Sequence, residues 1–178
     1  IRNRLVGDSG EVDPEFAYLR VKRQDGQEVL WGSYGAHATV LGSGEMQFHG
    51  DYPGVWQESV EAEVRGMALF AAGAVGSHGP RVSRSGWDGA QELGRSLARR
   101  VLDRREQCDV QSEVVLGSVA VEFPLPPLLV RLDEHIQLRP WAAARVLPVA
   151  ETTVLQGVRI GSWIWLSTPC DFSGELAL

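Results

Sequence analysis

The sequence predicts a mixed α/β fold, with a mixed sheet, flanking helices and site-bearing loops at the strand ends. Three observations lead to this class. Two alternating segments flank Asp25-Gly26, the usual signal of a β-hairpin. Apolar residues recur at helical spacing after Asp51 and again after Asp88. Between those two helices, residues 67–75 form a small apolar run that is typical of a strand buried on both faces.

The composition limits the classes of protein to which the chain could belong. Its 178 residues suit one domain, and 44% hydrophobic with 22% charged residues is an ordinary globular balance. The net charge of -6 argues against a nucleic-acid partner. No apolar run approaches the ~20 residues needed to cross a bilayer. Two cysteines, Cys108 and Cys170, cannot make a disulfide framework and leave the redox compartment open.

The elements of the first half follow from these patterns in order. Residues 16–22 and 28–34 are the expected hairpin strands. Asp51 is a candidate helix cap, with Pro53 in the first turn. The helix that begins at Asp88 carries arginines on a face that we expect to be solvated.

The second half is expected to contain more strand than helix. Alternating apolar residues over 115–123 predict a strand that ends at a group of prolines. Residues 140–147 predict one or two helical turns with Pro at the first position. Segments 153–160 and 163–167 are expected to pair across Gly161-Ser162, a type II′ turn sequence.

Three loops at predicted strand ends carry the polar groups that could form a site, namely 35–51, 76–80 and 168–173. Ligands of α/β layers bind where such loops converge, so we expect these three to meet. His37 follows an apolar strand and opens a flexible loop, and a neutral imidazole is a good zinc ligand. The alternative for His37 is a core histidine that is satisfied by a backbone carbonyl.

Four further residues in these loops have two interpretations each. Asp171 could be an oxygen ligand for zinc or the cap of a helix that begins near Phe172 or Ser173. Asp51 could cap its helix and also hold the loop or a ligand histidine. His49 and His78 could each be a general acid or base, or simply solvent-exposed. Ser77 beside His78 is not expected to be a nucleophile–base pair, because adjacent loop side chains usually diverge.

These loops resemble the neutral/alkaline non-lysosomal ceramidase family, in segments spread over nearly the whole chain. Residues 35–41 (GAHATVL) are similar to the family's His-x-Thr segment, and 50–54 (GDYPG) to its Gly-Asp-x-x-Gly-Tyr segment. Residues 168–175 (TPCDFSGE) resemble its Pro-Gly-Glu-Phe-Thr segment. The chain departs from the family at 76–80 (GSHGP), where the family reads Gly-Asp-x-Ser-Pro. Gly79 therefore stands where the nucleophilic serine should be.

The resemblance implies hydrolysis of the amide bond of ceramide at a zinc ion. His37 would occupy a zinc-ligand position and Asp171 the position of a ligand glutamate. The family's other histidine ligand lies upstream and its tyrosine ligand downstream of the matching segments, outside this chain. The sequence begins without an initiator methionine, and 173–178 read as a helix start that stops at once. We therefore expect residues 1–178 to be a single domain, part of a larger ceramidase-like catalytic domain truncated at both ends.

The favoured hypothesis is a zinc-dependent hydrolase that cleaves an amide (N-acyl) bond of a lipid-like substrate through metal-activated water. That route needs no serine, and His78 or His49 would be the proton shuttle. The alternative is a non-catalytic ceramidase-like scaffold or binding module that has lost the serine nucleophile. A third hypothesis is that the missing ends supply half the ligands, so that this segment has no site of its own.

The expected partner is a small-molecule or lipid amide. The resemblance alone suggests an extracytoplasmic or membrane-associated location, including association with a membrane surface. The substrate's identity and the oligomeric state stay open at the level of sequence.

Overall fold

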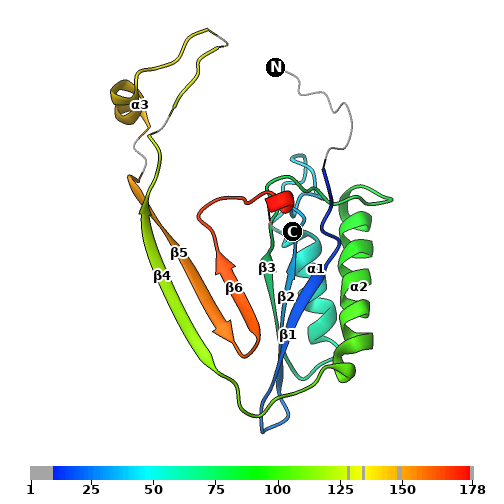
Figure 1. The fold of residues 1–178 in the computed structure, drawn as a ribbon. Helices are drawn as coiled ribbons and strands as arrows, with labels where there is room; N and C mark the ends of the chain where they lie inside the picture. Colours follow the sequence, from blue (N-terminus) through cyan, green and yellow to red (C-terminus); the bar gives the residue numbers. More distant parts are fainter. Residues whose placement is uncertain (1–9, 128, 134, 148–149, 177–178) are drawn as a thin grey trace. The chain divides into compact units, whose positions relative to one another are not determined.

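The computed structural model describes residues 10–127, 129–133, 135–147 and 150–176 (Figure 1). The chain divides into two compact units, which are described separately below. Unit 1 comprises residues 1–111 and 171–178, and unit 2 comprises residues 112–170. Two compact units can belong to one domain, so the single-domain expectation stays a prediction. The mixed α/β class is confirmed by two three-stranded sheets and their helices.

Unit 1 is built on a mixed sheet with the strand order β1-β2-β3. The hairpin strands β1 (Phe16–Lys22) and β2 (Glu28–Tyr34) are antiparallel and have the predicted bounds. Gly26 in their turn has a φ of 79°, a left-handed conformation that glycine adopts without strain. Strand β3 (Gly66–Ala72) pairs with β2 in parallel, which requires a crossover between them.

Helix α1 (Asp51–Glu61) makes this crossover and packs on β3. Helix α2 (Gly86–Arg104) packs on α1 and begins two residues before the predicted Asp88. A short 3₁₀ turn, η1 (Arg105–Gln107), follows it. At the helix contact, a Cβ on Gly94 would lie 2.6 Å from the Cβ of Val55, so the close approach depends on the glycine.

The core of unit 1 lies between the sheet and these helices. Its largest fully buried side chains are Trp56, Tyr52, Leu30 and Val60. The Phe70 ring makes edge-on contacts with both buried aromatic rings, at centroid distances of 5.7 and 5.8 Å. The helical spacing of Trp56 and Val60 therefore predicted the buried face of α1 correctly.

The expectation that 67–75 is a strand buried on both faces is wrong in two respects. Strand β3 ends at Ala72, and Met67 and Leu69 are 53% and 41% exposed, whereas Ala68 is 1% exposed. Within the described part of unit 1, β3 pairs only with β2 and presents one face to α1. An edge strand covered on one side buries alternate residues only.

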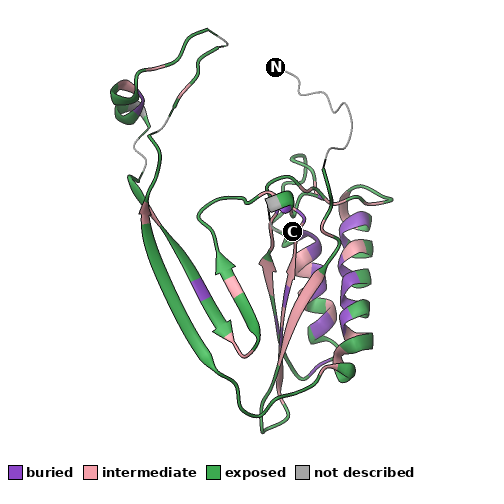
Figure 2. Cartoon of the chain, in the orientation of Figure 1, coloured by how far each residue is buried: buried purple, intermediate pink, exposed green. Residues whose placement is uncertain are grey.

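Unit 2 contains an antiparallel sheet of β4 (Leu116–Pro124), β5 (Thr152–Ile160) and β6 (Trp163–Ser167). The helix α3 (Pro140–Val146) and the β5–β6 hairpin are confirmed, and Gly161 has a φ of 63°. Figure 2 shows that these strands are exposed along most of their length. The alternation of apolar residues thus located β4 correctly. It did not predict burial within unit 2, because both faces of β4 are largely exposed there.

The chain returns to unit 1 at Asp171, and its last described element is a 3₁₀ turn, η2 (Gly174–Leu176). Among the described helices, none combines the length and the apolar character needed to cross a membrane.

Candidate functional site

The parallel pairing of β2 and β3 places two of the predicted loops at the same end of the sheet. Tyr34 and Ala72 are paired at the last position of the two strands. The backbone N–H of Gly73 then donates to Tyr34 O at 2.9 Å. Farther into the loops, the backbone N–H of His37 donates to His78 O at 3.0 Å. Parallel strands thus bring two histidines together although they are far apart in sequence.

The third loop reaches this end through the segment that follows Asp171. Gly76 N donates to Phe172 O at 2.7 Å, so the two loops touch through their backbones. A Cβ on Gly76 would lie 2.3 Å from Asp171 O, which leaves no room for a larger residue. The expected convergence is therefore present for segments 35–41, 76–78 and 171–174 of unit 1.

His37 and Asp171 face each other across this meeting point. Nε2 of His37 lies 3.7 Å from Oδ2 of Asp171, and the two side chains are 40% and 70% exposed. A contact this exposed contributes only ~0–1 kcal/mol to stability. The chemical interest of the pair is that one nitrogen and one oxygen donor are accessible at one point.

The donor set fits zinc, for which imidazole nitrogen and carboxylate oxygen are ordinary ligands. Two ligand atoms at ~2.0–2.2 Å from a tetrahedral ion lie about 3.4 Å from each other. The 3.7 Å separation of Nε2 and Oδ2 is close to that value. Among the described residues no group of three or more His, Cys, Asp or Glu side chains could hold a metal. His37 and Asp171 could thus supply part of a coordination shell, and their ligand role stays a prediction.

Asp51 holds the loop that carries His37. Its Oδ2 accepts the backbone N–H of Leu41 at 2.8 Å, and its Oδ1 accepts that of Tyr52 at 2.6 Å. The helix begins at Asp51 itself, with Gly50 before it, so the expectation of an ordinary Asp51 cap is wrong. Asp51 has a φ of 53°, which Asp tolerates better than most residues, and is only 5% exposed.

Tyr52 fixes the other end of the same loop. Its buried hydroxyl donates to Ala36 O, next to His37. Burial raises the pKa of Tyr52 well above its ordinary value of 10.0, so the hydroxyl keeps its proton. Sequence reasoning missed this residue, and the available signal was an aromatic side chain directly after Asp51 on the apolar side of the helix.

His49 belongs to a different cluster in the same long loop. Its Nδ1 accepts the backbone N–H of Asp51 at 2.8 Å, and its ring lies edge-on to Trp87 at 4.3 Å. Trp87 Nε1 in turn donates to Glu45 at 2.9 Å. The described contacts of the His49 side chain are therefore with this cluster, and not with His37 or Asp171.

The expectation that the side chains of Ser77 and His78 diverge is wrong. Ser77 Oγ lies 3.0 Å from His78 Nδ1. Ser173 Oγ and Gly174 N also donate to Ser77 Oγ, at 3.0 and 3.1 Å. Gly174 leaves room for the imidazole, because a Cβ there would lie 2.0 Å from His78 Cε1. Both side chains turn toward the same segment because that segment supplies their partners.

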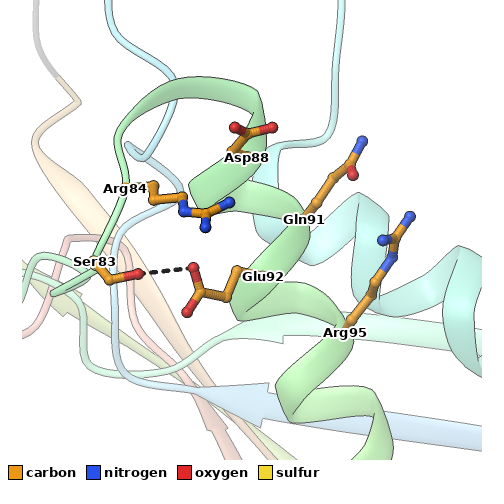
Figure 3. A pocket seen from close by; sticks show the side chains of 6 residues that line it. All are labelled: Ser83, Arg84, Asp88, Gln91, Glu92 and Arg95. Carbon is orange, nitrogen blue, oxygen red and sulfur yellow. Dashed lines mark hydrogen bonds between the residues drawn. The ribbon is translucent and has the colours of Figure 1, made fainter.

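A polar hollow of about 320 Å³ lies elsewhere, at the start of α2. Figure 3 shows its lining side chains and the 2.7 Å hydrogen bond from Ser83 to Glu92. Two arginines and two carboxylates line it together, so neither charge predominates. None of the candidate site residues predicted from the sequence lines this hollow.

Comparison with solved structures gives the fold a known counterpart. A crystal structure of neutral ceramidase from Pseudomonas aeruginosa matches with a TM-score of 0.66 and 16% identity. A ceramidase complexed with C2 matches with a TM-score of 0.66 and 15% identity. Each match covers 91% of this chain but only 35% and 37%, respectively, of the other chain. No family model matches the sequence, and no curated protein matches it either. The chain therefore has a ceramidase-like fold.

Proposed function

We propose that this chain forms part of a zinc-dependent hydrolase that cleaves an amide (N-acyl) bond of a lipid-like substrate. One observation carries the proposal, the 3.7 Å approach of His37 Nε2 to Asp171 Oδ2. It occurs in a fold similar to that of neutral ceramidases, whose names supply the substrate class. The chain spans about a third of those proteins, so the activity of the whole protein is part of the proposal.

His37 and Asp171 would hold the zinc ion in this proposal. Bound zinc would supply Lewis-acid polarisation of the carbonyl and a water of lowered pKa, ~7. The chain's own contribution is to orient the imidazole. Asp51 and Tyr52 hold the two ends of its loop, and the backbone N–H of His37 is bound by His78 O. These hydrogen bonds hold the backbone on both sides of the His37 side chain, and so they limit the positions that its imidazole can reach.

His78 is the better candidate for a proton shuttle than His49. Its carbonyl touches the backbone of His37, and its ring lies beside the segment that follows Asp171. A general acid or base must come within hydrogen-bond reach of the reacting groups, directly or through one water. The described partners of His49 are instead the backbone N–H of Asp51 and the ring of Trp87 in α2.

The test measures zinc content and hydrolysis in the full-length protein. After dialysis against buffer with trace zinc, inductively coupled plasma mass spectrometry should find stoichiometric zinc in the protein. Chromatography of the reaction mixture should detect cleavage of a short-chain ceramide. His37→Ala and Asp171→Ala should lose both properties. His135→Ala removes an exposed histidine of unit 2 and should keep both. Absence of zinc, or unchanged metal and turnover in His37→Ala, would overturn the proposal.

The second candidate is a binding module with the same fold and no hydrolase activity. Gly79 favours the binding module, because glycine has no hydroxyl and stands where the family has its nucleophilic serine. The surroundings do not require a glycine there, since a Cβ on Gly79 would meet nothing within 4 Å. The same experiment separates the two candidates. Stoichiometric zinc with no cleavage of the ceramide supports the binding module, whereas zinc-dependent cleavage supports the hydrolase.

A further inference from the structure

We infer that Ser173, Ser77 and His78 form a proton relay in which Ser173 is a nucleophile and His78 is its base. The two serine Oγ atoms lie 3.0 Å apart, and Ser77 Oγ lies 3.0 Å from His78 Nδ1. All three residues belong to unit 1. The inference rests on the proposed function in one respect, because the acyl substrate is taken from it.

The direction of the relay follows from the hydrogen bonds of Ser77. A serine hydroxyl has one proton to donate and two lone pairs to accept with. Gly174 N donates to Ser77 Oγ at 3.1 Å and Ser173 Oγ donates at 3.0 Å, so both lone pairs are occupied. With Ser173 as the donor of the Oγ–Oγ bond, the proton of Ser77 points to His78 Nδ1, and the relay requires the imidazole tautomer that carries its proton on Nε2.

The same bonds identify Ser173 as the nucleophile. Attack on a carbonyl carbon needs a lone pair that the substrate can approach, and the two lone pairs of Ser77 are occupied. Ser173 donates in its bond to Ser77, which leaves both of its lone pairs outside that bond. Its side chain is half-buried, two residues after Asp171. Ser77 thus transmits the proton and Ser173 would contact the substrate.

His78 is held in place from three sides. Its backbone N–H donates to Val75 O and its carbonyl accepts from His37 N, each at 3.0 Å. Its ring occupies the space left open by Gly174, where a Cβ would be 2.0 Å from Cε1. A base with a fixed position beside the hydroxyl is the usual way in which a serine is activated.

The covalent step conserves every atom and proton. Ser173 Oγ bonds to the acyl carbon while its proton moves to Ser77 and the proton of Ser77 moves to His78 Nδ1. The C–N bond then breaks, and the amine leaves with the proton that His78 returns through Ser77. Water hydrolyses the resulting ester to the free acid and restores the Ser173 hydroxyl. Ser173, which lies in another loop, would thereby replace the serine that is missing at Gly79.

The experiment uses a fluorophosphonate probe on the full-length protein, with and without a metal chelator. In this reaction Ser173 Oγ bonds to phosphorus, fluoride leaves and the proton passes to His78. Peptide mapping by mass spectrometry should find one adduct, on Ser173, and Ser173→Ala should abolish it. Ser77→Ala should slow labelling by about 100-fold or more, the usual contribution of a positioned base. Ser77→Thr keeps the hydroxyl and should restore most of the rate.

The controls separate the relay from the fold and from the proposed function. Ser43→Ala removes an exposed loop serine and should label at the parent rate. Thermal melting should be similar for Ser77→Ala and Ser77→Thr, so that the difference in labelling rate reports the relay. An adduct on another serine, or an unchanged rate in Ser77→Ala, would overturn the inference. The labelling assay needs neither zinc nor ceramide. The relay can therefore be confirmed or overturned whether or not the protein proves to be a zinc-dependent hydrolase.

Discussion

The carboxylate of Asp51 accepts the backbone N–H of Leu41 at 2.8 Å, and this bond holds one end of the loop that carries His37. The second carboxylate oxygen binds Tyr52 N, so both oxygens are in use at a position that is 5% exposed. A residue in this situation affects both stability and the position of the candidate ligand.

Asp51→Asn should lower the free energy of unfolding by about 1.5–3 kcal/mol, because the amide can accept from only one of the two N–H groups. It should also weaken zinc binding by about 10–100-fold, the usual effect of removing support behind a ligand. Urea unfolding and calorimetric zinc titration measure the two effects. Asp88→Asn, in the exposed first turn of α2, should cost less than about 1 kcal/mol. Equal losses in the two variants would contradict the role given to Asp51.

Tyr52→Phe should cost about 1–3 kcal/mol, because it keeps the buried ring but leaves the buried Ala36 carbonyl without its donor. Zinc binding should weaken with it, since Ala36 precedes His37. Chemical denaturation and zinc titration again give the readouts. Tyr34→Phe removes a hydroxyl outside this bond and should leave zinc affinity unchanged. A Tyr52→Phe protein that keeps full zinc affinity would show that the loop does not need this donor.

Gly76→Ala should separate the loops that carry His78 and Asp171, because its Cβ would lie 2.3 Å from Asp171 O. Backbone atoms cannot move aside cheaply, so we expect a loss of more than about 2 kcal/mol or an opened loop. Gly79→Ala is the matched control, since a Cβ there meets nothing within 4 Å. It should change the melting temperature little. Similar melting of both variants would argue against the packed contact at Gly76.

The stability of unit 1 should fall in acid because of Glu28. Arg20 donates two hydrogen bonds to this carboxylate, at 2.7 and 3.1 Å, and this lowers the pKa of Glu28 from its ordinary 4.5. A lowered folded-state pKa contributes stability above pH 4.5 that is lost as the pH falls through the lower value. Glu28→Gln should therefore cost about 1.5 kcal/mol at pH 7, and the difference from the parent should shrink toward pH 3.

Denaturation at a series of pH values checks this pH dependence. Glu58→Gln, on the exposed side of α1, is the control and should parallel the parent at every pH. A Glu28→Gln deficit that stays constant from pH 7 to pH 3 would rule out the ionised pair as its cause.

Local patterns predicted most of the elements because they depend on neighbouring residues. The Asp25-Gly26 turn fixed where β1 ends and β2 begins, and the Gly161-Ser162 turn fixed where β5 ends and β6 begins. The misjudged elements were those whose burial depends on distant partners. Strand β3 buries alternate residues because α1 covers one of its faces. The apolar residues of β4 also alternate, but unit 2 buries neither of its faces.

The sequence by itself determined the α/β class and the loops that could carry chemistry, and it singled out His37 and Asp171 as candidate zinc ligands. Only the tertiary structure decided that these two donors approach within 3.7 Å, and that Ser77 and His78 turn toward each other. The physical reason is the range of the contacts. Ser77 takes its orientation from residues 96 and 97 positions away, whose hydroxyl and backbone N–H groups both donate to its oxygen.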